Sequence, residues 1–139
     1  MRQLLLSALL TGLLVPRGHA QSEQRRDVPV TRTRADSGEQ MFRAYCASCH
    51  GVDGKGDGPA AAALKVAPPD LTSLKRSNGG KFPDRKVRNI LAGADDLSAH
   101  GSAGMPVWGP VLRSLHPGNE SVVNLRIANL VAYLSAMQK

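Results

Sequence analysis

Aromatic side chains are scarce in this chain of 139 residues. Phenylalanine, tyrosine and tryptophan make up 4% of the sequence, whereas hydrophobic residues of all kinds make up 42%. A single domain of this length buries a modest share of its surface, so a hydrophobic core with few large side chains would be only marginally stable. A bound apolar group would supply the missing bulk and would stabilise the folded state by mass action.

Cysteine and acidic residues are also few. The two cysteines, Cys46 and Cys49, lie in one short motif, which excludes a separate disulfide framework. There are 11 Asp and Glu against 18 Lys and Arg, so the formal net charge is +7. The basic residues are scattered without interleaved aromatics, which argues against nucleic acid as a partner. The charge instead favours acidic protein partners or an anionic membrane surface, through electrostatic steering.

No hydrophobic run is long enough to span a bilayer. The longest, Leu4–Val15, has 12 residues, whereas a spanning helix needs roughly 20. With Arg2 before it and Gly18-His19-Ala20 after it, this run is typical of a signal peptide over residues 1–20, cleaved after Ala20. Removing these residues, which include Arg2 and Arg17, leaves a net charge of +5. An uncleaved anchor is the alternative interpretation.

The remaining chain divides into a tail and a folded domain. Residues 21–35 are polar, carry four arginines and have no helical or strand period, so we predict a flexible basic tail. The folded domain then spans residues 36–139. Asp36 and Ser37 are suitable caps for a first helix from about Gly38 into the cysteine motif, with Met41 and Phe42 facing the core.

Three further helices are predicted downstream. A short alanine-rich helix fits residues 59–66, and a second helix begins with Asp84 as its cap and ends at Gly93. A last amphipathic helix spans residues 120–138 and should cross the first helix near Gly38 and Phe42. The glycine-rich residues 51–59 and the polar residues 73–81 and 94–104 are predicted loops. The pattern predicts an all-α fold.

Cys46-Ala47-Ser48-Cys49-His50 is the arrangement that attaches a c-type haem to protein. On a helical turn the two thiols share a face and can reach the two vinyl groups of one porphyrin, and His50 can turn a ring nitrogen to the iron. Alternatives are coincidence, a disulfide, a thioredoxin-like redox pair, or half of a zinc site completed by His100 and His116. Export favours haem, because c-type haem is attached outside the cytoplasm.

Met105-Pro106 is the second informative stretch. A thioether is the soft ligand that partners histidine on a low-spin electron-transfer iron, and the other methionines lie in the signal or on predicted helices. A carbonyl of the Pro68-Pro69 turn could hold the Nδ1 proton of His50, although a purely rigid turn is the alternative. Trp108 is expected to pack against the porphyrin or elsewhere in the core.

From about Asp36 to Lys139 the chain resembles the single-haem class I cytochrome c family. The matching features, in order, are Gly38, Phe42, Cys46-x-x-Cys49-His50-Gly51, Pro68-Pro69 followed by Asp70-Leu71, Met105-Pro106 and a C-terminal helix bearing Tyr133. The resemblance implies a small all-helical fold wrapped around one haem c, with thioether bonds from Cys46 and Cys49. It also implies that His50 and Met105 are the axial ligands, although they are 55 positions apart and a long glycine-rich and loop sequence separates them.

Filled axial sites leave no vacancy for substrate, so we expect a periplasmic electron carrier rather than an enzyme. Its partners would be acidic redox proteins, with peripheral membrane association possible, and it would be a monomer or a subunit of a larger periplasmic oxidoreductase. The alternatives are a haem enzyme or gas-binding protein with an open sixth site, served by His100, and a metal-free thiol redox protein. Candidate docking residues around the haem edge are Lys55, Lys75, Arg76, Lys81 and Arg113.

Overall fold

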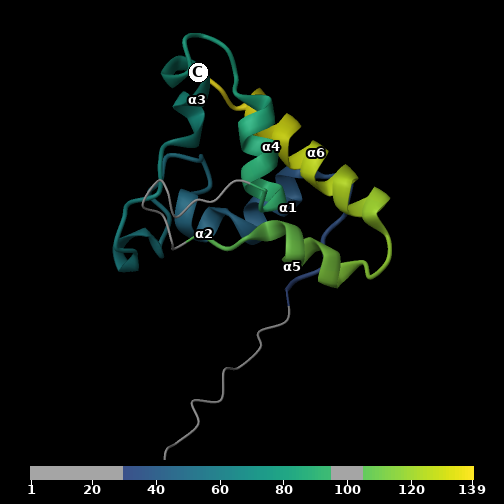
Figure 1. Cartoon of the computed structure of the whole chain (residues 1–139). Coiled ribbons are helices and arrows are strands. Elements are labelled where there is room, and N and C mark those ends of the chain that lie inside the picture. Colours follow the sequence, from purple (N-terminus) through teal and green to yellow (C-terminus); the bar gives the residue numbers. More distant parts are fainter. Residues whose placement is uncertain (1–29, 95–104) are drawn as a thin grey trace, which may run out of the picture.

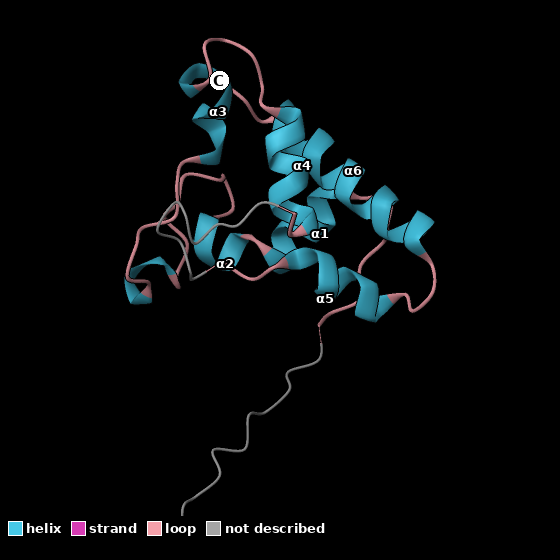
Figure 2. Cartoon of the chain, in the orientation of Figure 1, coloured by secondary structure: helices cyan, strands magenta, loops and turns pink. Residues whose placement is uncertain are grey.

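The computed structural model describes residues 30–94 and 105–139, and these two segments contain helices and loops but no strand (Figures 1 and 2). The predicted all-α fold class is confirmed. None of the helices in this described part has the length and hydropathy to cross a bilayer. In chain order the α-helices are α1 (Gly38–Tyr45), α2 (Ala47–His50), α3 (Leu74–Ser77), α4 (Asp84–Ala92), α5 (Trp108–Leu115) and α6 (Glu120–Ala136), with 3₁₀ helices at Ala61–Ala63 and Leu71–Ser73.

The first and last helices cross at a glycine, as predicted. Ser37 caps α1, because its hydroxyl accepts a hydrogen bond of 3.2 Å from the Gln40 backbone N–H. A Cβ atom at Gly38 would strike the Asn129 carbonyl oxygen of α6 and would lie 2.8 Å from the Tyr133 Cβ. Only glycine therefore permits the two backbones to approach this closely.

Helix α6 forms the centre of the core, where it packs against α1, α4 and α5. Its predicted apolar stripe is buried from Val123 through Leu134, and the half-buried Met137 continues it. The ring of Phe42 packs against Tyr133 at a centroid distance of 5.4 Å. The largest side chains with almost no exposure are Phe42, Met41, Leu112, Leu130, Val123 and Val131.

The structure differs from the sequence-based elements in four places. The alanine-rich helix predicted over 59–66 is only the 3₁₀ turn at Ala61–Ala63, and α4 is capped by Pro83 rather than by Asp84. Part of the loop predicted over 73–81 is the short helix α3. Helix α5 was not predicted, because Gly109 and Pro110 indicate a loop. Pro110 is tolerated because it lies in the first turn, where a backbone N–H has no helical partner.

Residues 30–35, which we assigned to the polar tail, are hydrogen-bonded to the helical domain. The buried guanidinium of Arg126 on α6 donates 2.9 Å to the Thr33 hydroxyl and 2.6 Å to the Thr33 carbonyl. Asn129 donates 3.0 Å to the Ala35 carbonyl. These contacts join positions more than 90 residues apart, so a search for local periodicity does not detect them. The rest of the predicted tail and the predicted signal peptide lie outside the described residues.

Candidate cofactor site

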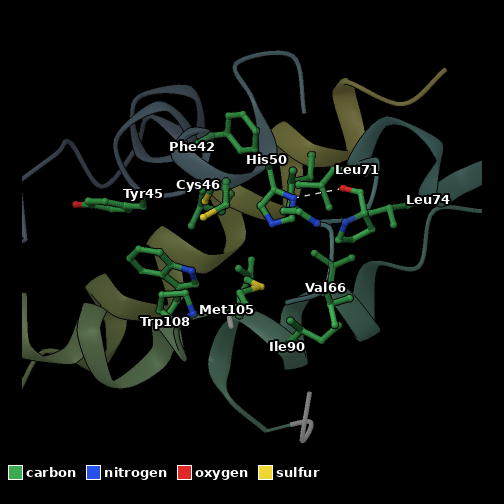
Figure 3. Close-up of a pocket in the computed structure, with 18 of the residues that line it drawn as sticks. Phe42, Tyr45, Cys46, His50, Val66, Leu71, Leu74, Ile90, Met105 and Trp108 are labelled. Carbon is green, nitrogen blue, oxygen red and sulfur yellow. Dashed lines mark hydrogen bonds between the residues drawn. The ribbon is translucent and has the colours of Figure 1, made fainter. Parts of the chain in front are cut away.

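A cavity of about 660 Å³ lies between the cysteine motif, the Pro68-Pro69 turn, α4 and the start of α5 (Figure 3). Its volume is within the range of roughly 300–1,000 Å³ that is typical of small-molecule and cofactor sites. Most of its wall is hydrophobic, and Leu71, Leu74, Ile90, Leu130 and Leu134 are among the lining residues. A flat apolar ligand would therefore bury most of its surface against hydrophobic side chains here.

Both cysteines line this cavity and form no disulfide with each other. The backbone leaves the helical path at Cys46, between two helices. Helix α1 ends at Tyr45, and α2 begins at Ala47 with the His50 N–H donating 2.9 Å to the Cys46 carbonyl. Burial, with a smaller contribution from Cys49, raises the pKa of the Cys46 thiol to about 12. The thiol is therefore protonated near neutral pH.

His50 is buried beside the Pro68-Pro69 turn, as one of the two predicted alternatives requires. Its Nδ1 lies 3.4 Å from the Pro69 carbonyl oxygen, and with the proton on Nδ1 the ring donates to that carbonyl. Burial lowers the pKa of His50, while the Pro69 carbonyl acts in the opposite direction. The neutral imidazole then has a free lone pair on Nε2, the form in which histidine binds a metal.

The glycine-rich loop that follows the motif holds this turn in position. Gly56 has φ +83°, and a Cβ atom there would strike the Pro68 carbonyl oxygen. The Gly56 N–H donates 2.8 Å to the His50 carbonyl, and the Leu71 N–H donates 2.7 Å to the Gly54 carbonyl. The predicted loop is thus a structural spacer between the histidine and its carbonyl partner.

Met105 lines the same cavity and is half-buried, on the side opposite His50 in Figure 3. Trp108 follows at the start of α5, and its ring stacks on Tyr45 at a centroid distance of 5.2 Å and an interplanar angle of 25°. Both aromatic rings line the cavity beside Cys46. The four predicted site residues, Cys46, Cys49, His50 and Met105, are therefore brought together, whereas His100 lies outside the described residues.

A hydrogen-bond network behind Tyr45 was not predicted. The Tyr45 hydroxyl donates 2.7 Å to the Thr31 carbonyl and lies 2.9 Å from the Thr33 hydroxyl, which in turn accepts from Arg126. The Nε of Arg126 donates 3.1 Å to Nε2 of His116. One signal was available in the sequence, because Arg126 lies three residues after Val123 and shares the buried face of α6.

These residues fit a covalently attached haem. Two thiols three residues apart, a buried neutral imidazole and a thioether all line one apolar cavity of suitable volume. The helical fold and this donor set together define a c-type cytochrome domain of class I.

The comparisons with known proteins agree with this class. Over residues 33–114 the chain matches the family described as cytochrome c oxidase, cbb3-type, subunit III, and it belongs to that family. No curated protein matches the sequence. Family membership confirms haem c, with its iron, as the covalent cofactor and haem-based electron transfer as the general function.

Proposed function

We propose that this protein is a periplasmic carrier of single electrons whose haem c is bonded to Cys46 and Cys49 and axially ligated by His50 and Met105. The observation that carries the proposal is that His50 and Met105 lie on opposite sides of the cavity that both thiols line (Figure 3). Haem c supplies the iron couple that exchanges one electron at a time. The site residues would hold that iron in a largely hydrophobic cavity.

Each of these residues has a separate task. The carbonyl of Pro69 orients the imidazole of His50 through Nδ1, which directs Nε2 into the cavity. The sulfur of Met105 is a soft ligand and would favour a higher reduction potential, as does the exclusion of water by the apolar wall. Because protein groups would fill both axial positions, no substrate site remains, and the domain acts as a carrier rather than as an enzyme.

The distribution of cations supports an acidic redox partner. Of the candidate docking residues, Lys55 lies 4.0 Å from Asp53 and Arg113 lies 3.2 Å from Glu120, so both have acidic neighbours. Lys75, Arg76 and Lys81 are exposed and form no ion pair within the described residues. These three residues, near α3, are the best candidates for steering an acidic protein to the domain.

Export of the chain remains part of the proposal. Residues 1–20 have the order of charge, apolar run and small residues that signal peptidases recognise, and cleavage after Ala20 would release the folded domain with residues 21–35 before it. Haem attachment at the cysteine motif requires the same compartment. N-terminal sequencing of the secreted protein tests the cleavage position, and Gln21 is the expected first residue.

Mass spectrometry and absorption spectroscopy test the cofactor and its ligands. The intact secreted protein should weigh more than the polypeptide by one haem, and its ferric form should have the weak long-wavelength band of methionine-ligated iron. Met105→Ala should abolish that band and allow carbon monoxide to bind the ferrous form, whereas Met41→Leu, on the buried side of α1, should do neither. A Met105→Ala protein with an unchanged spectrum would rule out this ligand.

A subunit of a larger oxidoreductase is the second candidate, because the family description names subunit III of an oxidase. Such a subunit would keep the same cofactor and the same axial ligands. Native purification distinguishes the two, since a carrier elutes alone and a subunit elutes with other chains. An enzyme or gas-binding protein with an open iron site would instead bind carbon monoxide without any substitution.

A further inference from the structure

One part of the cavity wall is formed where α3 leads into α4, and it includes polar residues. Lys65 and Lys86 are the cations that line the cavity within the described residues, and Ser77 and Asn78 are uncharged polar residues that line it between α3 and α4. Another part of the wall is formed by Cys46 together with the stacked rings of Tyr45 and Trp108 (Figure 3).

Covalent attachment determines which edge of a haem meets each end. The two vinyl groups of the porphyrin are on adjacent pyrrole rings, and the two propionates are on the other pair. Thioether bonds from Cys46 and Cys49, which are part of the proposed function, therefore direct the propionates to the far end of the cavity. In Figure 3 Leu74 and Val66 lie on the side of the cavity away from Cys46.

A carboxylate that enters an apolar cavity needs a cation or hydrogen-bond donors, because desolvation of an unpaired charge is costly. Lys86 can supply the cation. It lies one helical turn before Ile90, both residues line the cavity and Lys86 is exposed, so its aliphatic stem can follow the wall and its ammonium group can extend to the rim. No ion pair of Lys86 exists within the described residues.

The neighbouring groups complete an anion-binding end. Ser77 is an exposed lining residue, and its hydroxyl makes no hydrogen bond within the described residues. The side-chain amide of Asn78 donates 2.7 Å to the Lys81 carbonyl, which holds the turn between α3 and α4 in position. Pro83, the N-cap of α4, also lines the cavity, so the positive end of the helix dipole lies at this part of the wall.

We propose that Lys86 and Ser77 bind a propionate group of the haem, at the end of the cavity opposite the two cysteines. Lys86 then has two effects. It compensates a carboxylate near the iron, and it raises the reduction potential, because removal of a positive charge from this position would favour the ferric state.

The experiment compares Lys86→Gln with Arg85→Gln in the haem-bearing protein. Arg85 is the adjacent exposed residue and does not line the cavity, so the control removes the same formal charge from the same helix turn. Lys86→Gln should shift the ferrous-to-ferric equilibrium at a set potential about threefold toward ferric, which is about 28 mV at 59 mV per tenfold change for one electron. Arg85→Gln should shift it less than half as far.

Proton contacts in the unsubstituted protein provide the second measurement. Nuclear Overhauser effects should connect the propionate methylene protons to the side chains of Lys86 and Ser77. Equal shifts in the two variants, or propionate contacts to Tyr45 and Trp108 instead, would overturn the assignment. A secreted protein without covalent haem would refute the proposed function itself, which mass spectrometry detects separately from either result.

Discussion

Gly56 offers a direct test of how the glycine-rich loop positions the iron-binding histidine. An alanine at this position must adopt φ +83°, and its Cβ atom would strike the Pro68 carbonyl oxygen. Gly80 provides a matched control, because its φ is +86° and no atom lies within 4 Å of a Cβ atom built there. The two substitutions share the backbone strain and differ in the contact.

The expected losses can be worked out from these two terms. A left-handed alanine costs about 1–2 kcal/mol, and this is the whole expected loss for Gly80→Ala. The collision with the Pro68 carbonyl adds the cost of overpacking, roughly 1–3 kcal/mol, so Gly56→Ala should lose about 2–5 kcal/mol in total. In a domain of this size each kcal/mol lowers the melting temperature by roughly 4–8 °C.

The assay is thermal unfolding of both haem-bearing variants, followed at the haem absorption band, together with their reduction potentials. Displacement of the Pro68-Pro69 turn should move the Pro69 carbonyl from Nδ1 of His50 and change the potential in Gly56→Ala alone. Equal losses of stability in the two variants would show that the Pro68-Pro69 turn moves away from the new Cβ atom without an energetic cost. A destabilised Gly56→Ala protein with an unchanged potential would show that Pro69 does not tune the imidazole.

Three further substitutions test other contacts. Gly38→Ala should destabilise the protein by about 1–3 kcal/mol through overpacking against α6, whereas helix propensity alone predicts a gain of up to about 1 kcal/mol. The sign of the change in the free energy of unfolding, measured in urea, distinguishes the two effects. Thr33→Val leaves a donor of the buried Arg126 without its partner and should cost about 1–3 kcal/mol, whereas Thr31→Val, which changes an exposed side chain, should stay within about 0.5 kcal/mol. The Asp70 carboxylate accepts from the Thr72 hydroxyl and N–H, which lowers its pKa, so stability is present above the ordinary pKa and is lost as pH falls below about 4. Asp70→Asn should flatten that part of the pH profile, and an unchanged acid slope would contradict the assignment.

Much of the fold was predictable because its signals are local. The Ser37 cap and the apolar spacing that follows it predict α1. Gly93 marks the end of α4, and the long row of apolar residues predicts α6. The close crossing at Gly38 was also predictable, because a glycine on a helix that faces another helix indicates backbone approach. His50 and the two thiols belong to one pentapeptide, which is why the amino-acid sequence alone locates the site.

The missed features depend on residues distant in sequence or on a tolerated helix breaker. Pro110 indicates a loop by composition, yet it lies in the first turn of α5, where its missing N–H costs nothing. The attachment of residues 30–35 depends on Arg126, which donates hydrogen bonds to Thr33, 93 residues away along the chain. A pattern of neighbouring residues in the sequence does not indicate such a distant hydrogen bond. The charge of arginine also predicts an exposed side chain rather than a buried one.

The hydrogen bonds of residues 30–35 to the helical domain have a practical consequence for the design of truncated variants. A fragment that starts at Asp36 would keep every helix of the described residues and the whole haem motif. It would lack Thr33, however, so the buried guanidinium of Arg126 would keep only His116 of these hydrogen-bond acceptors. Such a fragment should accumulate poorly in cells even though it looks complete by helix boundaries. The smallest unit worth expressing therefore begins no later than Val30.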